Sequence, residues 1–517
     1  MTEQPPLRPT DDLSKRTLAG LQWNALGSAV SAVLHIVMAA ILARLLSPAA
    51  FGLVALASVF LRFADYFSRA GITQALIQKH SLSRDDIRAG FTLSVAFGTA
   101  FGVSTILLAP LAGRFAEDPE LVPVLQLLSL GLLLNGLGAP SVALLRRHLR
   151  FKELAMLNLG SYVAGYAIVG ISMALAGAGV YALVAASLTQ TAVKAIAAYA
   201  LIRHPLMPTL SRASHRAILG FGSRITGISI LEFLRSNLDT LAVGRWAGST
   251  QLGFYNRANM LADLPAYHLS NSLSQVLFPS FSAIQSELRR LRNAYLSAVG
   301  ATAAIIFPLN AGMAVSAREL ILVILGPQWV GAIEVMPWLL LASAIGLTGH
   351  FAGIVAEAQA ALNAKMLIAG GSTATLALLL WLAEGRSLSA YGAALAGAAA
   401  VSHIGYVLVI SRTLDTSFGT LVRPLVPAIA GAGLVAAAIA GTRVALIHGL
   451  GVSTVFVLVA EIIVGALTLA ALFRKGPLRV YRYDFARRLT DAGALDGSHR
   501  KFGRLVAWLV GPTQAKP

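Results

Sequence analysis

Apolar runs of about twenty residues recur along the chain and are separated by short polar segments. Each run is long enough to cross a hydrocarbon layer of about 30 Å as a helix. This pattern predicts about fourteen spans, near residues 18–46, 51–67, 89–112, 121–145, 155–176, 180–202, 218–246, 261–281, 296–315, 335–356, 366–383, 391–410, 422–439 and 452–473. The predicted fold class is therefore an all-α integral membrane protein.

An internal repeat relates the first two spans to spans seven and eight. Identical residues recur 201 positions apart without a gap, among them Arg44 and Arg245, Gly52 and Gly253, and Gln74 and Gln275. Six helices separate the copies, and because this number is even, both copies have the same orientation in the membrane. We expect two parallel six-helix lobes followed by two extra helices.

This repeat predicts the division of the chain. The expected parts are a cytoplasmic N-terminus (1–17), an N-lobe (18–202), a cytoplasmic linker (203–217), a C-lobe (218–411), the two extra helices (412–473) and a basic cytoplasmic tail (474–517). The polar start of the chain shows no signal-peptide cleavage site, so we expect the first helix to be retained. The tail fits either a membrane-surface helix or a disordered end.

Composition and charge agree with a membrane protein. Of the 517 residues, 56% are hydrophobic and 12% are charged, whereas soluble domains carry about 25% charged residues. The net charge of +18 comes from basic clusters in alternate loops, such as Arg146, Arg147 and Arg150. By the positive-inside rule these loops and both termini face the cytoplasm, and nucleic acid is not needed as a partner. The outward loops are expected to hold single basic residues, namely Arg44, Arg114, Arg318, Arg386 and Arg443.

Polar side chains follow one face of each repeat-related span. A charge near the bilayer centre costs about 2.5–3.5 kcal/mol, so such residues must face protein or water. The polar faces are Asn24, Ser28, Ser31 and His35 on span one, Ser58, Arg62, Asp65 and Arg69 on span two, Arg224, Glu232, Arg235 and Asp239 on span seven, and His268, Asn271 and Gln275 on span eight. Spans five, thirteen and fourteen are nearly uniformly apolar apart from Glu461. A polar cavity between the two lobes is expected.

Arginine suits a diphosphate ligand, because its planar fork donates two parallel hydrogen bonds and stays charged in a partly dry cavity. The expected substrate-binding residues are Asn24, His35, Arg62, Arg224, Arg235, His268, Asn271 and Gln275. The expected gating or ion-coupling residues include Asp65, Arg69, Glu232 and Asp239, together with His350 and Glu357 on span ten. Two alternatives stay open: the charges of spans two and seven form a structural clasp, and His35 and His268 only fill space.

Several segments resemble one protein family. They are ARLLSPAAFGLVALA (43–57), GITQALIQK (71–79), LRFKELA (149–155), LDTLAVGRWAG (238–248), LGFYNRANMLADLP (252–265), VLFPSFSAIQ (276–285) and GPQWVGAIEVMPWL (326–339). They are similar to the polysaccharide transporters of the multidrug/oligosaccharidyl-lipid/polysaccharide exporter superfamily, and in particular to exporters of colanic and teichuronic acid. The likeness extends from about residue 18 to residue 473.

This resemblance implies that spans one, two, seven and eight line a central cavity. It also implies an undecaprenyl-diphosphate-linked oligosaccharide as substrate and alternating access as mechanism. An acidic residue that some relatives carry on span eleven is missing between Met366 and Ala383, which argues against sodium coupling. Asp239 and the neighbouring Asn237 are the nearest match to an ion site, and protonation of Glu232, Asp239 or Glu357 is left open.

The sequence therefore predicts a flippase of the bacterial inner membrane for exopolysaccharide or lipopolysaccharide synthesis. No cofactor and no enzymatic activity are expected, and the absence of cysteine excludes thiol chemistry. The expected partners are the lipid-linked glycan and membrane lipids, with a polysaccharide polymerase and chain-length proteins as further candidates. The alternatives are a cation-coupled multidrug exporter, a peptidoglycan-precursor flippase and a membrane glycan ligase or polymerase.

Overall fold

A computed structural model describes residues 27, 30–69, 71–79, 81–209, 233–450 and 452–481. All regular secondary structure in these ranges is helical. A helix satisfies its own backbone hydrogen-bonding groups, which a segment surrounded by lipid requires. The chain divides into two compact units, Met1–Asn256 and Arg257–Pro517, called unit 1 and unit 2 below. The boundary falls within the long helix α10 (Gly248–Ala283).

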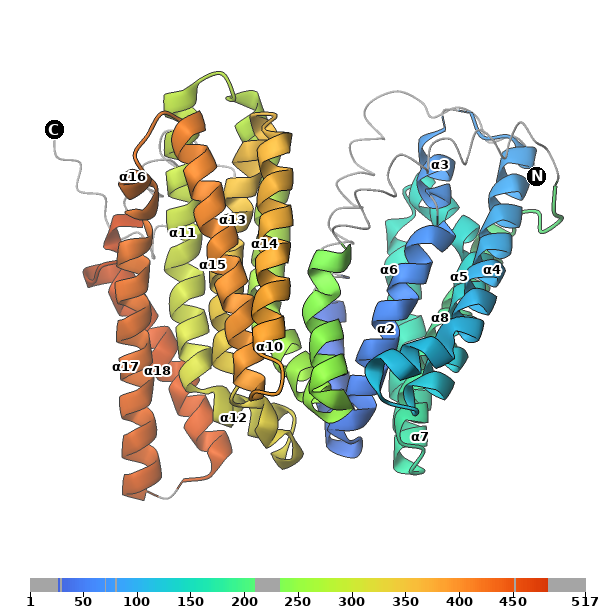
Figure 1. Cartoon of the computed structure of the whole chain (residues 1–517), viewed down its shortest axis with the longest axis horizontal. Coiled ribbons are helices and arrows are strands. Elements are labelled where there is room, and N and C mark those ends of the chain that lie inside the picture. Colours follow the sequence, from blue (N-terminus) through green and yellow to red (C-terminus); the bar gives the residue numbers. More distant parts are fainter. Residues whose placement is uncertain are drawn as a thin grey trace. The chain divides into compact units, whose positions relative to one another are not determined.

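Unit 1 is a helical bundle. Its elements are a helix at Val30–Leu45, α2 (Pro48–Arg69), α3 (Ile72–Gln78), α4 (Arg84–Ala116), α5 (Leu121–Arg147), α6 (Phe151–Tyr162), the π-helical η1 (Val163–Gly170), α7 (Ile171–Leu175), α8 (Val180–Ile202), a helix at 233–246 and the start of α10. α5 packs on both α4 and α8, and α2 contacts all three (Figure 1). Small residues allow close helix contacts, as is typical of membrane bundles.

Unit 2 is a second helical bundle. It contains the rest of α10, α11 (Leu288–Val315), α12 (Ala317–Ile324), the 3₁₀-helix η2 (Pro327–Ala332), α13 (Met336–Ala358), α14 (Leu362–Leu382), α15 (Leu388–Thr413), α16 (Phe418–Val422), α17 (Leu425–Leu450) and α18 (Thr454–Lys475). α13 packs against α11 and α15, while the hairpin of α17 and α18 packs on α11 and α12 (Figure 1). The buried core of this unit includes Phe281, Tyr295 and Phe351.

The predicted fold class is confirmed. Eleven helices in the described part of the chain are long and apolar enough to cross a membrane. At the other three predicted spans the structure has the shorter helix Val30–Leu45, the helix at 233–246 and the more polar α10. The count of fourteen spans and the lobe boundaries at 202 and 218 stay predictions, because much of 1–29 and 210–232 lies outside the described residues.

Two expected boundaries differ in the structure. Span eight is predicted to begin near Leu261, but α10 begins at Gly248. Gly248 has φ 83°, a value that glycine adopts without steric cost, so the chain reverses within one or two residues. Span thirteen is predicted to end near Ile439, but α17 continues to Leu450.

The expected position of Arg443 in an outward loop is wrong because α17 continues past this residue to Leu450. Arg443 lies inside α17, where its Nε is 3.2 Å from Oε1 of Glu319 and its Nη1 donates to the carbonyl of Val315. Because these acceptors satisfy the guanidinium, the helix continues past a charge at which a hydropathy pattern stops.

Basic residues of the predicted inward loops tie helix ends together. Arg147, at the end of α5, donates to the carbonyls of Leu76, Ile77 and Lys79 at 2.7–3.0 Å. These contacts satisfy backbone acceptors that α3 leaves open at its C-terminal end. Lys79 also pairs with the buried Asp86 at 2.6 Å. These loop charges therefore have structural contacts in addition to their predicted topological role.

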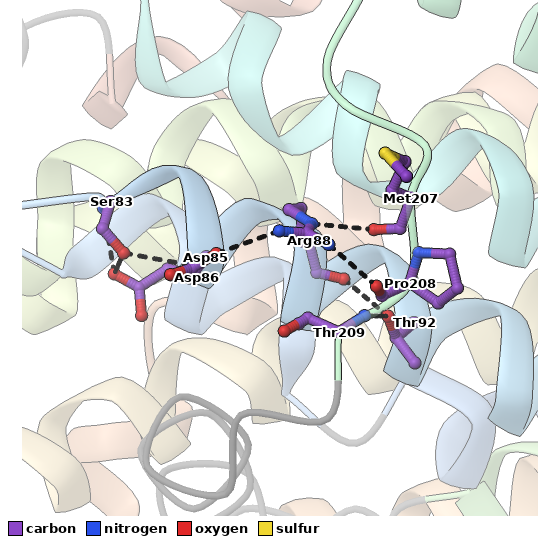
Figure 2. A network of polar contacts seen from close by, with 8 residues as sticks. All are labelled: Ser83, Asp85, Asp86, Arg88, Thr92, Met207, Pro208 and Thr209. Carbon is purple, nitrogen blue, oxygen red and sulfur yellow. Dashed lines mark hydrogen bonds and ion pairs between the residues drawn. The ribbon is translucent and has the colours of Figure 1, made fainter.

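The chain after α8 is held against the start of α4 (Figure 2). Arg88 donates through Nε to the carbonyl of Met207 and through Nη2 to that of Pro208, both at 3.0 Å. The Thr92 hydroxyl accepts the backbone N–H of Thr209 at 3.0 Å. Segment 203–209 thus begins the connection to the helix at 233–246 from a fixed position on unit 1.

Candidate functional site

The described parts of spans two and seven lie side by side in unit 1. Phe233, at the start of the described part of span seven, contacts Phe63 and Tyr66 of α2, with ring centroids 5.4 and 5.7 Å apart. Further along, Gly244 packs on Leu56 of α2. The helix at 233–246 therefore follows α2 over several turns, which places their polar faces near each other.

Asp239 is the buried acid of this interface. Its side chain is 7% exposed and accepts a 2.6 Å hydrogen bond from the hydroxyl of Tyr255, which is 1% exposed. Arg62 of α2 is close enough to act on Asp239 through its charge. Tyr255 is a residue that the sequence analysis missed, because it belongs to the next helix and to no polar stripe.

The other predicted residues of these two helices differ in their surroundings. Asn237 is buried and donates to the carbonyl of Phe233 at 2.8 Å. Arg62 and Arg235 are exposed, and Nε of Arg62 donates to the carbonyl of Ser58 at 3.3 Å. Asp65 is half-buried. Asn24, Arg224 and Glu232 lie outside the described residues, as does the side chain of Arg69.

Repeat-related residues also meet at the start of α2 and α10. A Cβ on Gly52 would lie 1.7 Å from the carbonyl oxygen of Ser249, and a Cβ on Gly253 would lie 1.9 Å from that of Pro48. Pro48 and Ser249 are themselves 201 positions apart. The contact is therefore reciprocal between the two copies of the repeat. It allows two helix backbones to approach as closely as glycine permits.

Arg245, the repeat partner of Arg44, forms an ion pair within unit 1. Its Nη1 lies 2.5 Å from Oε1 of Glu117, the residue that follows α4. This pair ties the end of the helix at 233–246 to α4 within unit 1.

A small polar cavity lies between the first span, α6 and α8 of unit 1. Its volume is about 250 Å³, and its walls are Ser31, Leu34, His35, Asn158, Leu159, Tyr162 and Gln190. The rings of His35 and Tyr162 meet edge to face at 4.2 Å, and Tyr162 stacks on Tyr166 at 4.7 Å. Ser31 and His35 of the expected polar face of span one border this cavity, which lies within unit 1. The expected cavity between the two lobes stays a prediction.

Two walls of this cavity were missed. Asn158 and Tyr162 belong to span five, which was expected to be nearly uniformly apolar, and Gln190 belongs to span six. Single polar residues in an apolar run give no periodic signal. The π-helical η1 follows Tyr162 directly, and such turns are frequent at functional sites.

Gly165 fixes the distance between η1 and α8. A Cβ at this position would lie 2.4 Å from the carbonyl oxygen of Ala186 and 2.8 Å from Cβ of Gln190. The absence of a side chain therefore lets Gln190 reach the cavity wall. Aromatic faces combined with a few amide, hydroxyl and imidazole groups are typical of sites for small polar ligands.

The predicted polar residues of unit 2 lie mainly on α10 and α13. His268, Asn271 and Gln275 are exposed on α10. His350 of α13 shares a 2.8 Å hydrogen bond with Ser274, which ties these two helices together. Between the same helices, Ser343 donates to the carbonyl of Ala262 at 3.3 Å.

Glu357, predicted as a gating acid beside His350, is half-buried and forms an ion pair with Lys365. This pair joins the end of α13 to the start of α14. The role of each predicted site residue stays a prediction.

Comparison with known proteins agrees with this architecture. Residues 41–334 match the family of the polysaccharide biosynthesis protein. The lipopolysaccharide biosynthesis protein WzxC of Escherichia coli K12 is 28% identical over 67% of this chain and 71% of its own length. The succinoglycan biosynthesis transport protein ExoT of Rhizobium meliloti is 25% identical over 78% of this chain and 82% of its own length.

Solved structures show the same fold. The lipid II flippase MurJ, in an inward closed conformation, superposes with a TM-score of 0.69 at 12% identity, over 90% of this chain and 99% of that protein. An inward-facing multidrug resistance MATE family transporter gives a TM-score of 0.54 at 16% identity, over 74% of this chain and 95% of that protein. With its multi-pass helical fold and a match that covers more than half of its length, the chain belongs to the polysaccharide biosynthesis protein family.

Proposed function

We propose that this protein is a flippase that moves an undecaprenyl-diphosphate-linked oligosaccharide repeat unit across the bacterial inner membrane, for exopolysaccharide or lipopolysaccharide synthesis. The observation that carries the proposal is membership of a polysaccharide biosynthesis family in a chain whose described residues include eleven helices long and apolar enough to cross a membrane. The name of the relative ExoT identifies it as a succinoglycan biosynthesis transport protein. The fold shared with the flippase MurJ adds support.

The charges of unit 1 suit the head group of such a substrate. Arg62 and Arg235 are exposed on membrane helices. One arginine side chain can donate two parallel hydrogen bonds to the oxygens of a phosphate group. In our proposal these two residues, together with Arg224, neutralise the diphosphate while the polyprenyl chain stays in lipid. His268, Asn271 and Gln275 supply hydrogen-bonding groups on α10.

The cavity at His35 suits a sugar residue of the repeat unit. It combines Tyr162 with the polar groups of Ser31, Asn158 and Gln190 in about 250 Å³. Aromatic and apolar walls with a few placed polar groups are typical of sites for small ligands. Asp239 and Glu357 would change partners during alternating access, because each already has one polar partner that it can exchange.

The proposal places both termini in the cytoplasm and involves no covalent step. A polymerase and chain-length proteins would act on the translocated unit. A multidrug exporter on the same fold would need an acidic cavity for cationic drugs. The exposed charges of α2 and of the helix at 233–246 include the positive Arg62 and Arg235, which would repel a cation.

Reconstituted transport tests this function. The purified protein is placed in lipid vesicles with an undecaprenyl-diphosphate-linked oligosaccharide that carries a fluorophore on the sugar. A membrane-impermeant quencher reaches half of the label at once, and we expect protein-containing vesicles to expose the rest much faster than protein-free vesicles. Arg62→Ala and Arg235→Ala should abolish this gain, while Arg290→Ala, which removes an exposed partner of Glu287, should retain it.

Three results would contradict the proposal. Equal exposure with and without protein would exclude translocation of this substrate. Faster exposure of labelled lipid II than of the oligosaccharide lipid would identify a peptidoglycan-precursor flippase, and proton-driven uptake of a cationic dye with no lipid translocation would identify a drug exporter.

A further inference from the structure

A buried group of charges joins the hairpin of α17 and α18 to the rest of unit 2. Glu461 is in α18, the most apolar of the eleven spans, and its side chain is 0% exposed. It faces Glu319 of α12, Arg443 of α17 and Ser316 at the end of α11. Glu319 is 2% exposed and Ser316 5% exposed. Four helices therefore contribute to one buried polar site.

The carboxylate oxygens of this site are poorly satisfied. Oε1 of Glu319 pairs with Nε of Arg443 at 3.2 Å. Oε2 of Glu319 and both oxygens of Glu461 are buried and have no hydrogen-bond donor in good geometry among the described residues. Among these residues the Ser316 hydroxyl is the one uncharged group close enough to act on Glu461, and it carries no charge to balance the carboxylate. A buried acceptor without a donor is costly, and an unpaired buried carboxylate is costlier still. The site as built is therefore incomplete when both acids are ionised.

The balance of charges indicates which group the site of Glu319 and Glu461 lacks. Two ionised carboxylates and one guanidinium leave one uncompensated negative charge in an apolar surrounding. Like charges in one buried site cannot both ionise readily, and such a pair retains a proton. Arg443 already supplies one positive charge at Oε1 of Glu319, so a single proton is enough to balance the site.

We propose that Glu319 and Glu461 bind one proton between them, and that this proton holds the hairpin of α17 and α18 on α11 and α12. The site is separate from the cavity at His35 and from the charged faces in unit 1. Because the two acids interact, the proton belongs to the pair. Glu461 carries it in the main, since Glu319 has the ion pair with Arg443.

The position of the site makes the proton accessible from one side. Arg443 precedes the end of α17 at Leu450, and Glu461 follows the start of α18 at Thr454, each by seven residues. At 1.5 Å per residue this is a depth of about 10 Å from the connection between the two helices. In the predicted orientation that connection faces outward, so the outer pH would set the occupancy.

Loss of the proton would weaken the packing of the α17–α18 hairpin on α11 and α12. Among the described residues the charged groups that face Glu461 from the elements packed on α18 are Arg443 and Glu319. A second negative charge would repel Glu319 at the joint of α12, α17 and α18. Apolar contacts of Ile439 and Leu472 in the same region remain, so the hairpin would loosen without dissociating from the chain.

Infrared spectroscopy of the purified full-length protein tests the proposal. We expect a carbonyl band of protonated carboxylic acid at neutral pH that Glu461→Gln reduces, together with a melting temperature that falls as the pH rises to alkaline values. Glutamine is neutral at every pH, so Glu461→Gln should remove most of the alkaline fall in melting temperature. Glu287→Gln, at an exposed ion pair with Arg290, should change neither the band nor the slope.

Three outcomes would overturn the inference. A carboxylic-acid band of equal size in the wild type and Glu461→Gln would show that Glu461 is ionised. An unchanged alkaline slope in a correctly folded Glu461→Gln would show that no proton there stabilises the hairpin. A rise in the melting temperature of the wild type with sodium chloride, but not with choline chloride, that Glu461→Gln abolishes would assign a sodium ion in place of the proton. None of these readouts depends on lipid translocation.

Discussion

Tyr255 donates a 2.6 Å hydrogen bond to Asp239, and both side chains are buried in unit 1. The bond joins the helix at 233–246 to α10 across the turn at Gly248. It supplies the buried carboxyl group of Asp239 with a side-chain donor from the next helix. The same oxygen is also available to exchange partners when the protein changes conformation.

Removing the Tyr255 hydroxyl is therefore expected to destabilise the protein. Tyr255→Phe removes the side-chain donor of a buried acceptor, which costs about 1–3 kcal/mol in free energy of unfolding. Thermal unfolding of the purified variant measures this change. Tyr267→Phe, at an exposed position on the same helix, is the control and should leave the melting temperature unchanged. Equal melting temperatures for both variants would show that the bond adds no stability.

The reciprocal glycine contact gives a second prediction. Gly52→Ala or Gly253→Ala would place a Cβ within 2 Å of a backbone oxygen, and a backbone cannot rotate away as a side chain can. The ends of α2 and α10 must separate, at a cost of about 1–3 kcal/mol or more. Gly370→Ala on α14, where no heavy atom lies within 4 Å of the new Cβ, is the matched control. Unfolding midpoints that fall only for the first two variants would confirm the contact.

The sequence predicted this part of the molecule unevenly. Asp239 and Arg62 were found because charges within a single helix repeat at its period. Tyr255 was missed because its partner is on another helix, and no periodicity within one helix encodes that pairing. The repeat identified Gly52 and Gly253 as equivalent, while their direct contact became visible only in the packed structure.

Pairing between helices also escaped the sequence patterns at Arg443 and at the cavity of unit 1. Arg443 was placed in a loop because hydropathy treats a charge as an end of a span, whereas Glu319 and the carbonyl of Val315 satisfy that charge within the bundle. Asn158 and Gln190 are isolated polar residues in apolar runs, so only their convergence on one cavity makes them candidates. Fold class follows from composition and run length, and polar pairing depends on tertiary packing.

The cavity of unit 1 predicts a pattern of transport defects. Tyr162→Ala removes an aromatic wall and should lower oligosaccharide-lipid translocation at least several-fold, while Tyr162→Phe keeps the ring and should retain most activity. Gly165→Ala should act like Tyr162→Ala, since its Cβ would displace Gln190. Tyr181→Ala, at an exposed position on α8, is the control. Normal translocation by correctly folded Tyr162→Ala and Gly165→Ala would exclude the cavity from the transport path.

The hydrogen bonds of Arg88 predict that segment 203–209 is protected from proteolysis. Arg88→Ala removes both hydrogen bonds to the carbonyls of Met207 and Pro208, so trypsin should cleave after Arg203 several-fold faster. Arg88→Lys should restore protection only in part, because an ammonium lacks the fork that reaches two carbonyls. Arg84→Ala, one turn earlier and exposed, is the control. Identical cleavage rates in the wild type and Arg88→Ala would show that Arg88 does not hold the segment.

His204 predicts a loss of stability in acid. It lies after α8, between the rings of Phe91 and Tyr199, and burial lowers its pKa from its ordinary value, against a smaller opposing effect of the contact with Pro205. Nδ1 lies 3.2 Å from the carbonyl of Pro205, which can only accept, so Nδ1 carries the hydrogen. Nε2 is buried and has no hydrogen-bond partner among the described residues, so protonation there would create an unpaired buried cation.

Because the pKa of His204 is lower in the folded protein, the unfolded chain binds more protons as the pH falls. The free energy of unfolding is therefore highest above pH about 6.5 and decreases as the pH drops through that value toward the pKa of the folded state. His204→Gln cannot take the charge and should reduce this acid slope, as measured by chemical denaturation between neutral and mildly acidic pH. His148, whose pKa is lowered by burial and by Arg147 and Arg150, should account for part of what remains. An equal slope in His204→Gln and the wild type would show that His204 is already charged or accessible in the folded protein.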